Sequence, residues 1–134
     1  MPKEDYLLKY LEKLSRVIAA MIGLREKGFP DDSIKLAEET YKELLDLDID
    51  KLLKMPVSEF SVLLKTTGYS AKYLEALAEL TTELANSFMI LKNEQAQNIY
   101  TKALEIYSLL NEKDKTFSFE RETKISKLKE LINK

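Results

Sequence analysis

The sequence predicts an all-α protein that folds as a single domain over residues 1–134, and three observations support this class. Only three Gly and three Pro occur among 134 residues, whereas a sheet of this size would need many tight turns. The long segments between them repeat apolar residues at steps of three and four, the spacing of one helix face. Hydrophobic residues make up 45% and charged residues 33% of the chain, which is typical of a folded domain with a solvated exterior.

The first half of the chain predicts an antiparallel helical hairpin over residues 3–47. Its first helix is expected from about residue 3 to residue 27, because an apolar stripe keeps helical spacing there. The stripe consists of Leu7, Leu11, Leu14, Ile18 and Met21. Gly28 ends this helix, and Asp31, Asp32 or Ser33 is expected to cap the second helix, which continues to about residue 47.

A connector over residues 48–68 is expected to contain two short helical pieces. Met55-Pro56 separates them, because the residue before a proline avoids helical geometry. We interpret this segment as an insert that closes one edge of the core.

The second half predicts another antiparallel hairpin over residues 70–111, followed by a C-terminal helix over residues 118–132. The hairpin consists of a helix from Ser70 to about residue 91 and a second helix over about 94–111. The C-terminal helix is expected to turn its apolar residues inward as a cap on the core. These residues are Phe119, Ile125, Leu128 and Leu131.

The composition excludes several kinds of chemistry. The chain has no Cys and no His, which removes thiolate nucleophiles, cysteine-ligated metals and the usual general base near neutral pH. Carboxylates and lysines remain, but they form no recognisable catalytic motif. We therefore expect a protein that is not an enzyme and uses no cofactor and no metal.

Charge is distributed unevenly along the chain. Residues 31–60 carry nine acidic and four basic residues, whereas residues 111–134 carry seven basic and five acidic residues. Lys124, Lys127 and Lys129 are interpreted as a solvated helix face, with contact to an acidic partner as the alternative. A net charge of −2 disfavours nucleic acid as a partner. No apolar run is long enough to cross a membrane, and the charged N-terminus lacks a signal-peptide core, so we expect a cytoplasmic protein.

The second hairpin carries a pattern of large and small residues that resembles the tetratricopeptide repeat. In its first helix the pattern is Leu84, Ala85 and Phe88, and in its second helix it is Ala96, Tyr100 and Ala103. The alanines let two helix axes approach to about 8 Å, while the tyrosine fills the adjoining gap. The alternative is an ordinary packing motif in an unrelated bundle.

The resemblance implies two hairpins in right-handed, tetratricopeptide-like stacking, with a short helical insert and a C-terminal capping helix. The first hairpin matches less well, with Ser33 and Thr40 where alanines are common. The layout is also similar to small bacterial tetratricopeptide-like proteins of uncharacterised function.

The same resemblance implies a non-catalytic module that binds a protein or peptide partner. The expected groove lies on the first helix of each hairpin, with Thr82, Asn86, Met89 and Ile90 as its candidate residues. In the first hairpin, Ile18 and Ile22 stand where the second has Thr82 and Asn86. A clamp for a terminal carboxylate is not expected, because the lysine that such a clamp needs is missing from both hairpins.

Two other functions remain open at this point. One is a small-molecule-binding or weakly enzymatic domain that uses carboxylates and tyrosines such as Tyr6, Tyr10 and Tyr41 around a core pocket. The other is an element whose only task is self-association. Two hairpins are fewer than the three units that repeat arrays need, so either the insert and the C-terminal helix complete the core or a homodimer does.

Overall fold

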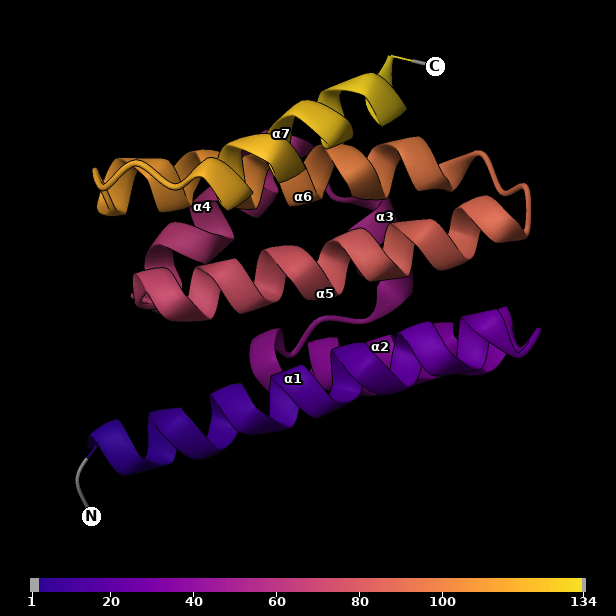
Figure 1. Cartoon of the computed structure of the whole chain (residues 1–134), viewed down its shortest axis with the longest axis horizontal. Helices are drawn as coiled ribbons and strands as arrows, with labels where there is room; N and C mark the ends of the chain where they lie inside the picture. The colour runs from indigo at the N-terminus through magenta and orange to yellow at the C-terminus, as the bar shows by residue number, and fades with distance from the viewer. Residues whose placement is uncertain (1–2, 134) are drawn as a thin grey trace.

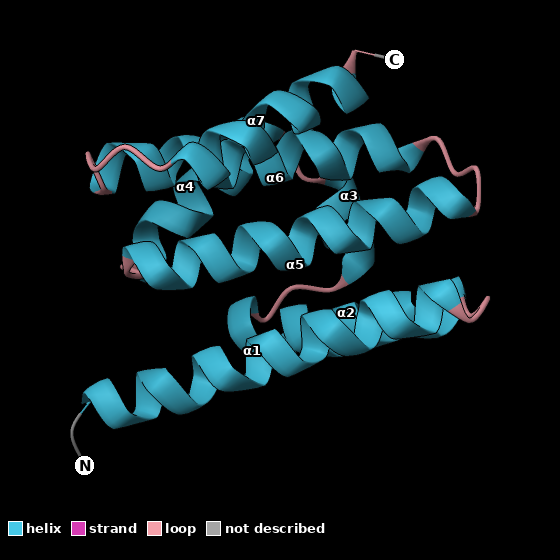
Figure 2. Cartoon of the chain, viewed as in Figure 1, coloured by secondary structure: helices cyan, strands magenta, loops and turns pink. Residues whose placement is uncertain are grey.

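The structure is a computed structural model that describes residues 3–133 of the chain and the side chains from residue 8 onward (Figure 1). The described residues form seven helices and no strand, as Figure 2 shows, and the predicted all-α class is confirmed. The helices are α1 Lys3–Glu26, α2 Pro30–Leu45, α3 Ile49–Lys54, α4 Val57–Thr67, α5 Ala71–Ile90, α6 Gln95–Lys113 and α7 Phe119–Ile132.

Most helix ends follow the turn chemistry of the sequence. Gly28 and Gly68 adopt positive φ angles of 90° and 68° after α1 and α4, a conformation that glycine reaches without strain. Ser70 and Ser118 cap α5 and α7, where their hydroxyls accept hydrogen bonds from backbone amides at 3.4 and 3.2 Å. Met55 lies between α3 and α4 in an extended conformation, where the following proline requires it.

The limits of α2 differ from the prediction. The helix starts at Pro30 with Phe29 at its cap position, and no side chain caps it. Ser33 is therefore not a cap but a fully buried residue, which shares a hydrogen bond of 3.0 Å with Ser87 of α5. The helix ends at Leu45 rather than residue 47, because Asp46 turns into the left-handed region with a φ of 52°.

Helix α5 lies at the centre of the molecule. It contacts α1 and α2 on one side and α6 on the other, and α6 in turn contacts α3, α4 and α7. Figure 1 shows α2 returning beside α1 and α6 returning beside α5, with α7 crossing α6. Half of the residues of α5 are buried by these neighbours, so the first and second halves of the chain share one core.

The alanines of the second half lie inside this core. Ala96, Tyr100 and Ala103 are each at most 1% exposed. The Tyr100 hydroxyl donates a hydrogen bond of 2.5 Å to the side-chain oxygen of Asn86 on α5. Since Ala96 and Ala103 share the face of Tyr100 at helical spacing, all three are directed toward α5. Leu84, Ala85 and Phe88, on α5 itself, are also buried.

The apolar face of α7 is displaced from its predicted position. Phe119 is 76% exposed, whereas Arg121 is buried together with Ile125 and Leu128. These three inward residues follow each other at steps of four and three, and Phe119 lies two residues before the first, on another side of the helix. The terminal nitrogens of the Arg121 guanidinium pair with Glu75 at 3.3 Å and Asp114 at 3.1 Å, whereas its buried Nε has no partner within the described residues.

Enlarging the small residue at position 103 should destabilise the fold. Ala103→Leu adds three carbons where α5 and α6 are already in contact, and we expect a loss of about 1–3 kcal/mol in the free energy of unfolding. The control is Ala19→Leu, at an exposed position of α1, which should change it by less than about 0.5 kcal/mol. Urea unfolding followed by circular dichroism measures both; equal effects would contradict close packing at Ala103.

Candidate functional site

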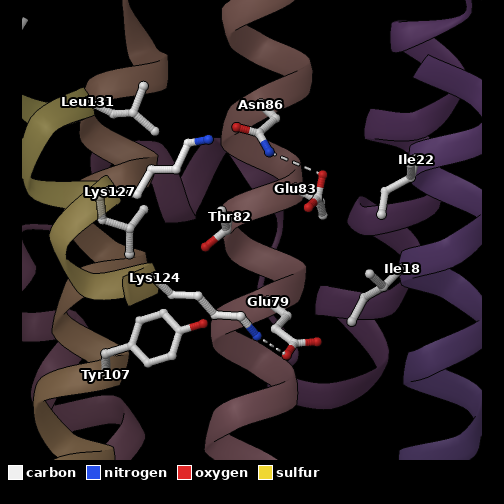
Figure 3. Close-up of a pocket in the computed structure, with 11 residues that line it drawn as sticks. Ile18, Ile22, Glu79, Thr82, Glu83, Asn86, Tyr107, Lys124, Lys127 and Leu131 are labelled. Carbon is white, nitrogen blue, oxygen red and sulfur yellow. Dashed lines mark hydrogen bonds and ion pairs between the residues drawn. The ribbon is translucent and has the colours of Figure 1, made fainter. Parts of the chain in front are cut away.

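A groove of about 360 Å³ lies between α1, α5 and α7 (Figure 3). Its wall on α1 is aliphatic and consists of Ile18 and Ile22. Its floor is the polar face of α5, where Glu79, Thr82, Glu83 and Asn86 follow at helical spacing. The groove exists because the other faces of α5 are used for contact with α2 and α6, which leaves this face without a covering helix.

The opposite wall comes from α7, with one contribution from α6. Lys124 and Lys127 lie at the floor side of α7, and Leu128 and Leu131 add aliphatic surface beside them. Tyr107 reaches the groove from α6, below α7 (Figure 3). The site thus has an aliphatic wall on one side and a cationic and aliphatic wall on the other.

A hydrogen-bonded network fixes the upper end of the floor. Arg25 of α1 pairs with Glu83 at 2.6 Å, and Glu83 accepts a hydrogen bond of 3.1 Å from the side-chain nitrogen of Asn86. The Asn86 oxygen accepts from Tyr100 at 2.5 Å, so both ends of its carboxamide are engaged. Burial, with a further contribution from the Glu83 charge, raises the pKa of Tyr100, and its hydroxyl remains a donor at neutral pH.

Charge in the groove is paired with one exception. Lys124 pairs with Glu79 at 2.8 Å, and Glu83 is held by Arg25. Lys127 extends from α7 toward α5 and has no carboxylate partner among the residues that the structure describes (Figure 3). The groove therefore presents one uncompensated positive charge.

Of the four residues that the sequence predicts to line a groove, two line it in the structure and two do not. Thr82 and Asn86 line it, together with Ile18 and Ile22 of the first hairpin. Met89 and Ile90 are 36% and 57% exposed at the C-terminal end of α5 and do not line it. Tyr107 and the α7 lysines were not predicted as groove residues, because periodicity marks Tyr107 as core and does not reveal where α7 packs.

The tyrosines suggested for a core pocket do not gather around one. Tyr10 donates to Glu43 at 2.9 Å on the exposed side of α1 and α2. The Tyr41 hydroxyl is buried against the Thr81 hydroxyl, and burial raises its pKa. Neither residue lines the groove, and the side chain of Tyr6 lies outside the described residues.

Lys102 is a buried lysine that helical periodicity alone does not identify. Its side chain is inaccessible on α6, and its ammonium group donates a hydrogen bond of 2.5 Å to Asn98. Asn98 in turn donates to the backbone oxygen of Leu53 in α3 at 2.7 Å. Burial lowers the pKa of Lys102. The residue joins α6 to the insert and takes no part in lining the groove.

Comparison with protein-family models, with curated proteins and with solved structures gives no match to this chain. Within residues 3–133, no helix is both long and apolar enough to cross a bilayer. In the same part of the chain, no group of three or more acidic side chains is arranged to hold a metal ion.

Replacing Arg25 should weaken the fold more than replacing Lys13, whose ion pair on the same helix is more exposed. Arg25→Met leaves Glu83, 19% exposed, without its cation, and we expect a loss of about 2 kcal/mol in the free energy of unfolding. Lys13→Met breaks an ion pair whose side chains are both 44% exposed, and should change little. Urea unfolding compares the two; equal losses would mean that the Arg25–Glu83 pair is no stronger than a surface pair.

Lys102 should make stability depend on pH. Burial makes the pKa of Lys102 lower in the folded protein than in the unfolded chain, where it has the ordinary lysine value of 10.5. At alkaline pH the unfolded chain therefore binds more protons than the folded protein. The contribution of Lys102 to the free energy of unfolding accordingly rises with pH until both states have lost the proton. Lys102→Met removes the cost of burying the charge, and we expect it to gain about 1 kcal/mol at pH 7. The difference in free energy of unfolding between Lys102→Met and the wild type should narrow between pH 7 and pH 10 in urea titrations. A gap that is constant or widens would contradict the lowered pKa.

Proposed function

We propose that this protein is a non-catalytic module that binds a segment of a partner protein in the groove between α1, α5 and α7. The observation that carries the proposal is the composition of this groove. Aliphatic side chains face each other from helices far apart in the sequence, and Lys127 beside them has no carboxylate partner within residues 3–133. Such a surface suits an amphipathic segment with aliphatic and acidic side chains.

The arrangement of the helices supports a tetratricopeptide-like relationship as part of this proposal. Helix α5 contacts both helices of the first pair as well as α6. The first helix of each pair lines the groove, and α7 follows the second pair on the same side. We propose right-handed stacking of the two hairpins, with α7 as the capping helix and α3 and α4 as an insert. In such stacks the first helices form the binding surface, which is where Ile18, Ile22, Thr82 and Asn86 lie.

A small-molecule ligand is the second candidate. A volume of about 360 Å³ falls at the lower end of the range for small-molecule pockets.

Self-association is favoured by a different observation, the exposed apolar residues Met89, Ile90 and Leu91 at the end of α5. Sedimentation or light scattering that shows a monomer at high concentration would remove a homodimer.

Peptide selection tests the groove. We expect a library of random 16-residue peptides, displayed with blocked C-termini, to yield binders that lose at least tenfold in affinity for Ile22→Glu, because this change removes aliphatic contact and adds a repelling carboxylate. Val62→Glu is the matched control, since Val62 is 60% exposed on α4 and does not line the groove; its affinities should stay within twofold. Binders that are insensitive to Ile22→Glu, or no binders at all, would contradict a peptide-binding groove.

A further inference from the structure

Helix α7 is attached to the rest of the protein by fewer buried residues than the helices beneath it. Of its 14 residues three are buried, compared with 10 of the 20 residues of α5 and nine of the 19 residues of α6. It packs closely on α6, which it crosses on the outside of the molecule (Figure 1), and two ion pairs join it to α5. Undocking this helix therefore takes few of its own side chains out of the core.

Arg121 anchors the start of α7. Its side chain is 7% exposed, and it pairs with Glu75 of α5 at 3.3 Å and with Asp114 of the loop after α6 at 3.1 Å. It also donates a hydrogen bond of 3.2 Å to Asn111 of α6. The buried Nε atom of the same guanidinium has no partner within the described residues. One cation thus joins α7 to three other segments, at the cost of an unpaired nitrogen.

The charges in this cluster are buried to different extents. The Arg121 side chain is 7% exposed, whereas those of Glu75 and Asp114 are 47% and 31% exposed. Water can therefore solvate both carboxylates whether or not the arginine is present, but the buried guanidinium depends on the carboxylates for its countercharge. Docking of α7 thus costs the desolvation of a cation and of an unpaired nitrogen, and the two carboxylates offset this cost.

The aromatic residues next to Arg121 do not share this role. Phe117 and Phe119 are 75% and 76% exposed, although an apolar side chain buried at this point would hold α7 without the desolvation of a charge. A polar anchor is more easily reversed, because the guanidinium and both carboxylates are well hydrated once the helix leaves. The anchor of α7 therefore permits release as well as docking.

We propose that α7 is a movable wall of the groove, and that the charge balance around Arg121 is the latch that keeps it docked on α5 and α6. Leu128 and Leu131 line the groove from α7, opposite Ile18 and Ile22 of α1, so undocking removes one of the two walls. A ligand that contacts both walls favours the docked state. This coupling to a ligand rests on the proposed function, whereas the latch is testable without one.

Hydrogen exchange under native conditions, followed by NMR or mass spectrometry, tests whether α7 opens on its own. In the wild type we expect the amides of α7 to exchange at least tenfold faster than those at the centre of α5, because undocking one helix costs less free energy than global unfolding. Ala103→Leu, which strains the α5–α6 contact in both the docked and the undocked states, should speed exchange in α5 and leave that of α7 within twofold. Equal acceleration of both helices would show that α7 opens only by global unfolding, and would overturn the movable wall.

Two changes of opposite sign test the latch. Glu75→Gln combined with Asp114→Asn leaves the buried guanidinium without a countercharge, and should speed exchange in α7 at least tenfold. Arg121→Met removes the buried charge and the unpaired Nε together, and α7 should exchange no faster than in the wild type. Glu79→Gln is the matched control, because its partner Lys124 is 45% exposed; α7 should then exchange within twofold of the wild type. Acceleration by Arg121→Met equal to that of the double variant, or none in the double variant, would overturn the latch.

The latch and the proposed function can fail separately. A selected peptide at ten times its Kd should slow exchange in α7 about tenfold, because it binds the docked state. Peptides that bind and leave this exchange unchanged would overturn the coupling to a ligand, while the peptide-binding function stands. A latch that responds to its variants as expected, in a protein for which no peptide is selected, would support the movable wall and overturn the peptide-binding function.

Discussion

The burial of α5 between the α1–α2 pair and α6 is the constraint on which the rest of the structure depends. A helix with neighbours on opposite sides needs small or paired side chains wherever another axis comes close. Toward α2, Ser87 shares a hydrogen bond of 3.0 Å with Ser33, and the Thr81 hydroxyl is paired with that of Tyr41. Toward α6, the contact is lined by Ala96 and Ala103. These contacts occupy the sides of α5 that face α2 and α6, so the face toward α1 and α7 stays polar and partly open.

That remaining face positions the two walls of the groove. Glu75, Glu79 and Glu83 follow at steps of four along α5, and each pairs with a cation from a flanking helix. The first two hold Arg121 and Lys124 of α7, and the third holds Arg25 of α1. The Lys124–Glu79 pair is exposed and contributes little free energy, whereas the Arg25–Glu83 pair is mostly buried. All three pairs link α5 to a flanking helix, and in this way they hold α1 and α7 on the two sides of the polar face.

The helices were predictable from the sequence because their signals are local. The three-four spacing of α5 and α6, the capping serines at 70 and 118 and the break at Pro56 all depend on neighbouring residues alone. Prediction failed where a distant contact decides the outcome. Ser33 has the chemistry of a cap, but its partner is Ser87 on another helix. Arg121 becomes buried because acidic groups of α5 and of the loop after α6 meet it there. For the same reason Thr82 and Asn86 could be predicted to line the groove. Lys127 and Tyr107 could not, since their place in the groove depends on how α7 crosses α6.

Most polar groups of the core are paired, and the pairs join elements that are distant in the sequence. Tyr41 and Tyr100 place their hydroxyls on partners, and Lys102 and Asn98 satisfy each other beneath α3. Within the described residues, the buried side-chain nitrogen and oxygen atoms without a partner are Gln97 Oε1 and Arg121 Nε. Tyr107 and Lys127 line the groove from α6 and α7, and Lys127 is exposed to solvent there. The Tyr107 hydroxyl is not among the buried atoms without a partner, because the aromatic ring packs in the core while the hydroxyl end lines the groove.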